Sequence, residues 1–123
     1  MKILLVDDSG FSRKSTSNLL QKLDKEIEIM EADSVTRALE IFNKTTPDLV
    51  ITDLVMPDQK GDALIKTLRA QGQTLFIAVL SANIQQLVQD EMLRIGADFF
   101  LGKPVNLEKL QKLMDAYKTK TNS

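Results

Sequence analysis

Three aspartates follow apolar runs at two places in the chain. The run Ile3–Val6 leads directly into Asp7 and Asp8, and the run Leu49–Thr52 leads directly into Asp53. Carboxylates held close together repel one another, and a cation bound between them relieves that repulsion. A ligand set made only of oxygen atoms suits Mg²⁺, a hard cation that keeps several of its waters. The pattern therefore predicts a Mg²⁺ site at Asp7, Asp8 and Asp53, with Asp53 also available as a nucleophile, since carboxylates form acyl-phosphate intermediates.

Strands must position these aspartates, and strand-like apolar runs alternate with helical patterns along the whole chain. Nearly unbroken apolar runs are typical of parallel strands that are covered on both faces of a sheet. Between them, apolar residues recur at helical spacing, as at Val35, Ala38 and Phe42, with Ser34 as the N-cap. The five expected strands are Lys2 to Asp7, Ile27 to Glu31, Leu49 to Asp53, Leu75 to Leu80 and Phe99 to Leu101.

One helix is expected after each strand. The first helix, over about 11–23, has an apolar face diluted by serines. After the second helix, an apolar stripe predicts a third helix that ends before Gly72. Further stripes predict a fourth helix from Ile84 to Ile95, closed by Gly96, and a fifth from Leu107 to Tyr117, with Asn106 as a cap. This order predicts an α/β fold with a doubly wound, five-stranded parallel sheet in the order 2-1-3-4-5, as in flavodoxin-like proteins. We expect one domain over residues 1–123, with a frayed polar tail at 118–123.

Composition removes several classes of chemistry. The 123 residues contain neither cysteine nor histidine, which excludes disulfides, thiolate metal sites, Ser-His-Asp triads and a phosphohistidine carried by this chain. The formal net charge of −1 gives no general attraction to nucleic acid or membranes, and we expect neither as a partner. The sequence shows no membrane-spanning apolar stretch and leaves no room for a signal peptide before the first strand, so a cytoplasmic protein is expected.

Further polar residues follow the remaining strands. The carboxyl ends of the strands in an open parallel sheet lie along one edge, so Ser81 after strand four and Lys103 after strand five are expected beside the aspartates. Lys103 can neutralise phosphoryl oxygens as a point charge, and the Ser81 hydroxyl can donate a hydrogen bond to one of them. The backbone carbonyl of Val55 is a candidate neutral ligand for the metal. Together these groups suit phosphoryl transfer, in which catalysis depends on positioning and charge.

With these positions identified, the chain resembles the receiver domain of two-component response regulators, and closely a stand-alone, CheY-like receiver. The resemblance spans the whole chain. It is carried by Val6-Asp7-Asp8-Ser9, by Asp53-Leu54-Val55-Met56-Pro57 with Gly61, by Ser81-Ala82, and by Gly96-Ala97 followed by Phe100 and Lys103-Pro104.

The resemblance implies a phosphoacceptor, with no enzymatic activity beyond self-catalysed phosphotransfer and autodephosphorylation. Asp53 would be phosphorylated by a sensor histidine kinase or a phosphotransfer protein, with Mg²⁺ in the acidic pocket of Asp7 and Asp8. Lys103 would contact the phosphoryl group, and its bond to Pro104 would be cis.

The resemblance also implies a switch. Ser81 would be the hydroxyl switch residue and Phe100 the aromatic one, altering the surface formed by the fourth helix, fifth strand and fifth helix. Since no DNA-binding or catalytic domain follows, we expect the output to be contact with a downstream protein. Chemotaxis is one pathway that the stand-alone form suggests, and an auxiliary phosphatase is a further expected partner. The apolar Val55 side chain leaves the rate of dephosphorylation open.

Other functions remain open from the residues alone. A haloacid-dehalogenase-like aspartyl phosphatase would need Asp-x-Asp after the first strand, whereas this chain has Asp7-Asp8-Ser9. A flavodoxin-like nucleotide binder would need a first loop rich in Gly, Ser and Thr, where two anions stand here. A receiver that signals without phosphate is a third alternative, which the complete set of site residues disfavours.

Overall fold

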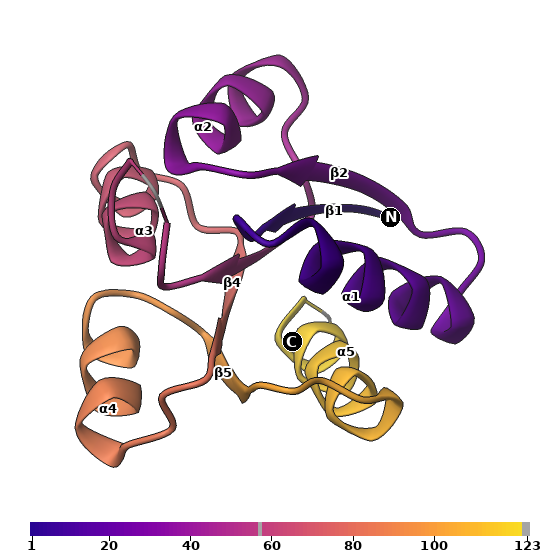
Figure 1. The fold of residues 1–123 in the computed structure, drawn as a ribbon. Helices are drawn as coiled ribbons and strands as arrows, with labels where there is room; N and C mark the ends of the chain where they lie inside the picture. Colours follow the sequence, from indigo (N-terminus) through magenta and orange to yellow (C-terminus); the bar gives the residue numbers. More distant parts are fainter. Residues whose placement is uncertain (57, 122–123) are drawn as a thin grey trace.

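The computed structural model describes residues 1–56 and 58–121, in which five strands alternate with five helices (Figure 1). Pro57, part of the motif that follows Asp53, and residues 122–123 lie outside the described residues. The elements are β1 Lys2–Val6, α1 Gly10–Leu23, β2 Glu28–Ala32, α2 Val35–Lys44, β3 Leu49–Asp53, α3 Gly61–Ala70, β4 Phe76–Ser81, α4 Gln86–Arg94, β5 Phe99–Gly102 and α5 Leu107–Thr121.

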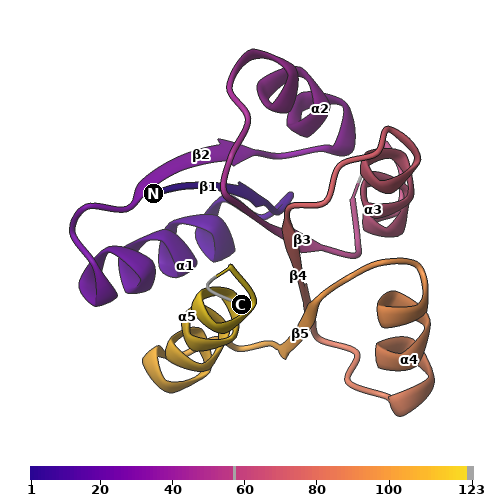
Figure 2. The same ribbon diagram turned by 180° about the vertical axis from the view of Figure 1, so that it is seen from behind.

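All strand pairs are parallel, and their order is β2-β1-β3-β4-β5. Helices α1 and α5 cover one face of the sheet, and α2, α3 and α4 cover the other (Figures 1 and 2). The predicted doubly wound fold is therefore confirmed. Because each crossover helix returns the chain to the edge at which the strands begin, all carboxyl ends of the strands gather at the opposite edge.

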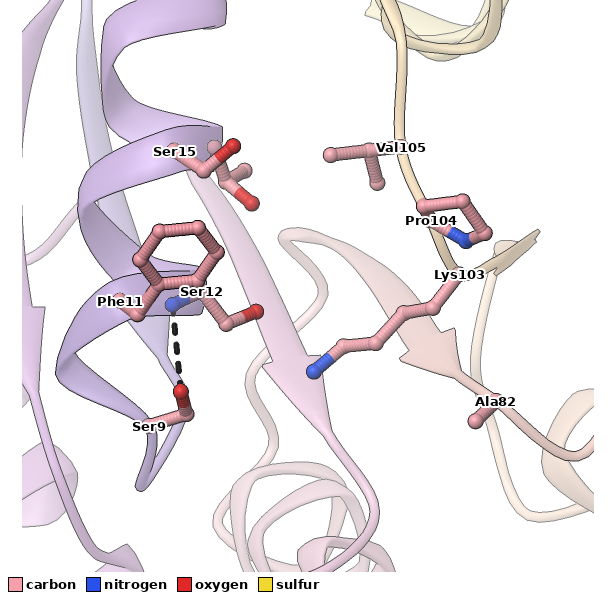
Figure 3. Close-up of a pocket in the computed structure, with 9 residues that line it drawn as sticks. Ser9, Phe11, Ser12, Ser15, Ala82, Lys103, Pro104 and Val105 are labelled. Carbon is pink, nitrogen blue, oxygen red and sulfur yellow. Dashed lines mark hydrogen bonds between the residues drawn. The ribbon is translucent and has the colours of Figure 1, made fainter.

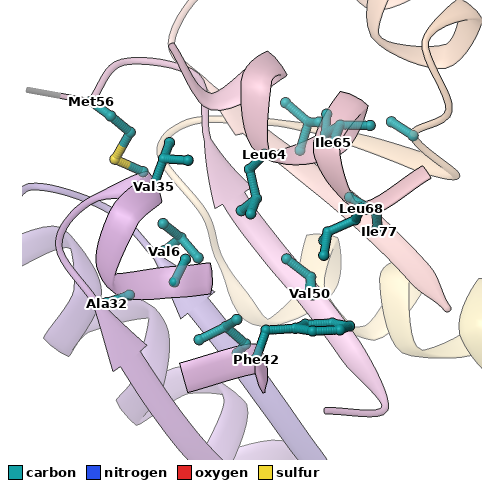
Figure 4. Packing of buried hydrophobic residues seen from close by; sticks show 14 of the residues in the cluster. Val6, Ala32, Val35, Phe42, Val50, Met56, Leu64, Ile65, Leu68 and Ile77 are labelled. Carbon is teal, nitrogen blue, oxygen red and sulfur yellow. The ribbon is translucent and has the colours of Figure 1, made fainter. Parts of the chain in front are cut away.

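The central strands are buried on both faces, and their side chains alternate between two apolar clusters. Leu4, Val6 and Val50 pack toward α2, α3 and α4 (Figure 4), whereas Leu5 and Ile51 pack toward α1 and α5. Each fully buried aliphatic side chain of this size contributes about 1.5–3 kcal/mol through its removal from water. This two-sided burial explains why the strands appear in the sequence as nearly continuous apolar runs.

Predicted caps are present at two helices. The Ser34 side chain accepts a hydrogen bond from the amide of Arg37 at 3.1 Å, and the Asn106 side chain accepts one from the amide of Lys109 at 2.8 Å. Gly96 has a φ of 122°, a conformation that side chains rarely allow, and it follows α4 as expected.

The predicted start of the fourth helix is wrong. Ile84 lies in the loop before α4 with 61% of its surface exposed, so it does not continue the apolar stripe. The Asn83 side chain accepts a hydrogen bond from the amide of Gln85 at 3.1 Å. Such Asx turns compete with helical bonding, and the helix begins only after this turn.

The expected frayed tail is also corrected for residues 118–121, which continue α5 as far as Thr121. The hydroxyls of Thr119 and Thr121 donate to helix carbonyls at 2.9 Å, and Lys120 pairs with Asp98. These contacts extend the helix beyond its apolar stripe. Within the described part of the chain, no helix is long and apolar enough to cross a membrane.

Candidate functional site: an acidic pocket at the carboxyl edge of the sheet

Three charged residues meet at the carboxyl ends of β1, β3 and β5. Asp7 follows β1, Asp53 is the last residue of β3, and Lys103 follows β5. The Lys103 Nζ donates to Asp7 Oδ2 at 2.9 Å and to Asp53 Oδ2 at 2.6 Å, and both aspartates are buried. One ammonium group thus holds two carboxylates from different strands beside each other.

The backbone around Asp53 fixes the direction of its carboxylate. Asp53 Oδ1 accepts hydrogen bonds from the amides of Leu54 at 2.6 Å and Val55 at 3.2 Å. The loop closes where the Gly61 amide donates to the Leu54 carbonyl at 2.9 Å. A Cβ atom on Gly61 would lie 1.9 Å from the Asp53 carbonyl oxygen, so only glycine fits this approach.

Asp7 is held in its ionised form. Its Oδ1 accepts from the Ser9 amide at 3.0 Å, and Arg13 Nη1 donates to its backbone carbonyl at 2.7 Å. Burial disfavours the charge, but hydrogen bonds from the Ser12 hydroxyl, Lys103 and the Ser9 amide together lower the pKa of Asp7. Burial likewise works against the charge of Lys103, yet its hydrogen bonds to Asp53 and Asp7 raise the Lys103 pKa.

Asp8 completes an acidic cluster with the two buried aspartates. Among the described residues, one carboxylate oxygen from each of Asp7, Asp8 and Asp53 lies within 4.8 Å of the others, and Asp8 is exposed. An oxygen-only donor set that is open to solvent on one side matches the preference of Mg²⁺ for few protein ligands and several waters. The residues present therefore fit the metal predicted from the sequence.

Ser81 lies at the same edge, but its hydroxyl is engaged with its own loop. Ser81 ends β4 and is buried, and its Oγ accepts from the Asn83 amide at 3.0 Å. The Lys103 amide donates to the Ser81 carbonyl at 2.8 Å, which ties the loop after β5 to β4. The bond between Lys103 and Pro104 is cis, as the resemblance implied.

Phe100 and its neighbour point to opposite faces of the sheet, as alternation requires. Phe100 is half-buried against the cluster under α2, α3 and α4, and Phe99 packs against the cluster under α1 and α5. The structure therefore places Phe100 on the same face of the sheet as α4, whose Met92 belongs to that cluster.

A pocket of about 430 Å³ opens beside Lys103, between α1 and the loop after β5 (Figure 3). Ser9, Ser12 and Ser15 line one wall, and the Ser12 oxygen points toward the side of the pocket that holds Lys103. Phe11 is 87% exposed at its rim. Two of the serines that dilute the apolar face of α1, Ser12 and Ser15, thus line an opening beside Lys103.

Two contacts of the segments around the site were not expected from the sequence. Arg13, in the first turn of α1, donates to the Asp7 backbone carbonyl. Asp58 binds the first turn of α2 from the loop after β3. Neither has a signal in the sequence, because both contacts join separate segments without any periodic pattern.

Comparison with known proteins identifies the family. Residues 3–115 match the family described as the response regulator receiver domain. The chain belongs to this family. The receiver domain is 30% identical over 109 residues to the chemotaxis protein CheY of Bacillus subtilis, covering 89% of this chain and 90% of that protein. The structure of CheY4 of Vibrio cholerae is similar with a TM-score of 0.85 and 32% identity, covering 94% of this chain and 97% of that one.

Relatives of the receiver domain also include longer proteins. The transcriptional regulatory protein PhoP of Escherichia coli is 30% identical over 116 residues, which cover 94% of this chain but 51% of PhoP. The chain thus spans about half the length of that relative. Receiver domains are signalling domains rather than enzymes of the usual kind, and they interact with histidine kinases or phosphotransfer proteins.

Proposed function

We propose that this receiver domain accepts a phosphoryl group on Asp53 from a phosphohistidine donor, with Mg²⁺ held by Asp7, Asp8, Asp53 and the Val55 backbone carbonyl. The observation that carries the proposal is the contact of Lys103 with both Asp7 and Asp53 beside a third carboxylate. A buried acceptor, a cation and an oxygen-only metal site in one small volume are the parts that phosphoryl transfer needs.

The transfer is a displacement at phosphorus. A carboxylate oxygen of Asp53 forms the new P–O bond while the P–N bond to the donor imidazole breaks, and the imidazole nitrogen keeps the bonding electrons. The Leu54 and Val55 amides hold the carboxylate in one orientation, which reduces the entropy lost on reaching the reactive geometry. Lys103, already hydrogen-bonded to Asp53, supplies positive charge for the phosphoryl oxygens. When bound, Mg²⁺ would add further positive charge at those oxygens.

We propose that the donor approaches from the α1 side. The pocket lined by Ser9, Ser12 and Lys103 is open to solvent, and Lys103 in its lining contacts Asp53 at 2.6 Å. The exposed ring of Phe11 offers an apolar contact at the rim. A histidine presented by a kinase or phosphotransfer protein would enter beside Lys103, next to the Asp53 carboxylate that this lysine contacts.

Phosphorylation would change the protein-binding face formed by α4, β5 and α5. In the present state the Ser81 hydroxyl accepts from Asn83 and keeps its own proton free to donate. A phosphoryl group on Asp53 would recruit that proton and Lys103, shift the loop before α4 and draw Phe100 inward. Full switching from 1:99 to 99:1 needs about 5.5 kcal/mol, whereas one charge-assisted hydrogen bond gives about 1.5–3 kcal/mol, so several contacts must act together.

A downstream protein would recognise this altered face, on which Leu87 of α4 is 81% exposed. Chemotaxis is one proposed pathway, and an auxiliary phosphatase is a further proposed partner. Capture of partners by the chain with and without beryllofluoride, a phosphoryl mimic, tests the output step.

The proposed acceptor role is tested by incubating the chain with Mg²⁺ and acetyl phosphate. We expect one phosphoryl group per chain, bound as an acyl phosphate that hydroxylamine releases, and no label when the metal is chelated. Absence of label from both acetyl phosphate and a phosphorylated histidine donor would sink the proposal. Sustained hydrolysis of a phosphate monoester, lost on changing Asp7 or Asp8 but not Asp53, would favour the aspartyl phosphatase instead.

Asp8→Asn is expected to weaken Mg²⁺ binding roughly tenfold, equivalent to about 1.4 kcal/mol. The variant removes one charged ligand from a cluster whose other two carboxylates already interact with Lys103. Isothermal titration calorimetry measures the effect. Ser81→Ala is the matched control, since its hydroxyl contacts Asn83, and its Mg²⁺ affinity should stay within twofold of the unmodified chain. Equal losses in both variants would contradict the ligand assignment.

A further inference from the structure

The loop between β3 and α3 reaches across to the beginning of α2. Asp58, in this loop, accepts a hydrogen bond from the Val35 amide on Oδ1 at 3.2 Å. Its Oδ2 accepts from the Thr36 amide at 2.9 Å and from the Thr36 hydroxyl at 2.6 Å. The first amides of a helix have no partner within the helix, so each must find one elsewhere.

The side chains of Asp58 and Ser34 accept hydrogen bonds from these amides. Ser34 accepts from the Arg37 amide, and Asp58 accepts from the amides of Val35 and Thr36. The carboxylate also places negative charge at the positive end of the α2 dipole. Hydrogen bonds from the Thr36 side chain and amide lower the pKa of Asp58 to about 2, because they favour the ionised carboxylate over the neutral acid. The first turn of α2 is therefore completed by a residue that lies 22 positions further along the chain.

The same loop is anchored a second time by an apolar contact. Met56 is buried in the cluster that contains Val35, and the two side chains lie next to each other (Figure 4). Between these anchors and Asp53 lies Val55, whose amide donates to Asp53 Oδ1. The position of the Val55 backbone thus depends on a loop that is tied to α2 through Met56 and Asp58.

We propose that Asp58 is a positioning residue for the metal and phosphoacceptor site, and that it couples Mg²⁺ binding to the stability of the first turn of α2. The inference rests on the proposed function, since it takes the Val55 carbonyl as a metal ligand. A metal that binds the loop while Asp58 is bonded to α2 stabilises this contact. By thermodynamic linkage, the contact between Asp58 and α2 strengthens metal binding by the same factor.

The test measures the effect of Asp58 on Mg²⁺ affinity and the effect of Mg²⁺ on the first turn of α2. In Asp58→Ala, calorimetry should show Mg²⁺ binding weakened roughly tenfold, the lower end of the range for residues that orient metal ligands. In the unmodified chain, Mg²⁺ should slow hydrogen exchange at the amides of Val35 and Thr36. In Asp58→Ala that metal-dependent protection should disappear. A role confined to helix capping would lower thermal stability without moving the Mg²⁺ dissociation constant.

Asp62→Asn is the matched control. Asp62 carries the same charge in the first turn of α3, but its carboxylate pairs with Lys66 of its own helix at 3.6 Å. Its substitution should leave Mg²⁺ affinity within twofold and leave the metal-dependent protection unchanged. Asp58→Asn keeps one acceptor oxygen, so it should give a two- to fourfold loss, and it supplies the decisive measurement if Asp58→Ala does not fold.

Two outcomes would overturn the inference alone. One is an Asp58 variant that binds Mg²⁺ as tightly as the unmodified chain, and the other is an equal loss in Asp62→Asn, which would show a general charge effect. If the unmodified chain binds no Mg²⁺ and takes up no phosphoryl group, both the proposed function and this inference are overturned.

Discussion

An Asp53→Asn variant is expected to take up no phosphoryl group, with labelling by acetyl phosphate reduced roughly a thousandfold or more, equivalent to about 4 kcal/mol in the barrier. The substitution replaces an anionic nucleophile with a neutral amide of the same shape. Its remaining oxygen can still accept from the Leu54 and Val55 amides, so the loop geometry should survive. The expected loss is therefore chemical rather than structural, and a radiolabelled or mass-spectrometric assay measures it.

Asp48→Asn is the control for this experiment. Asp48 precedes β3, so it lies at the opposite edge of the sheet, where its carboxylate accepts from the Lys2 amide at 2.8 Å. Its variant carries the same change in net charge as Asp53→Asn and should be labelled fully. Labelling that persists in Asp53→Asn would move the acceptor to another carboxylate, with Asp7 and Asp8 as the first to examine.

Gly61→Ala is expected to destabilise the fold by about 3 kcal/mol or more, at the upper end of the range for overpacked sites. The added Cβ would lie 1.9 Å from the Asp53 carbonyl oxygen and 2.9 Å from the Leu54 Cα. Both neighbours are backbone atoms, so no side-chain rotation can relieve the contact. Any relief must displace the acceptor strand or its loop, and phosphoryl uptake should fall with stability. Urea denaturation measures the free energy of unfolding.

Gly10→Ala provides the comparison for the glycine effect. Gly10 is the first residue of α1, and the atom nearest to an added Cβ is Arg13 Nη2 at 3.8 Å, an ordinary contact. This variant should be neutral or more stable by up to about 1 kcal/mol, because alanine favours the helical state. If Gly61→Ala were as stable as Gly10→Ala, the loop after Asp53 would have to adopt a conformation in which residue 61 does not approach the Asp53 carbonyl.

The convergence of the site residues followed from the sequence because it depends on a simple topological rule. The apolar runs have strand length, they alternate with helical stripes, and parallel strands place their carboxyl ends at one edge. Asp7, Asp53, Ser81 and Lys103 each occupy such an end, and the structure brings Asp7, Asp53 and Lys103 into contact there.

The hydrogen bonds that these residues make depend on how the loops pack between the elements. Loop conformations explain three features of the structure. The Ser81 hydroxyl accepts from Asn83, Ile84 lies outside α4, and Asp58 caps α2. Loop contacts between distant segments leave no periodic trace in the sequence, because their geometry is set by where the surrounding elements already lie. The sheet and the acidic cluster were thus determined by the apolar pattern and topology, whereas the coupling of the site to α2 arises only when the loop after β3 is packed against that helix.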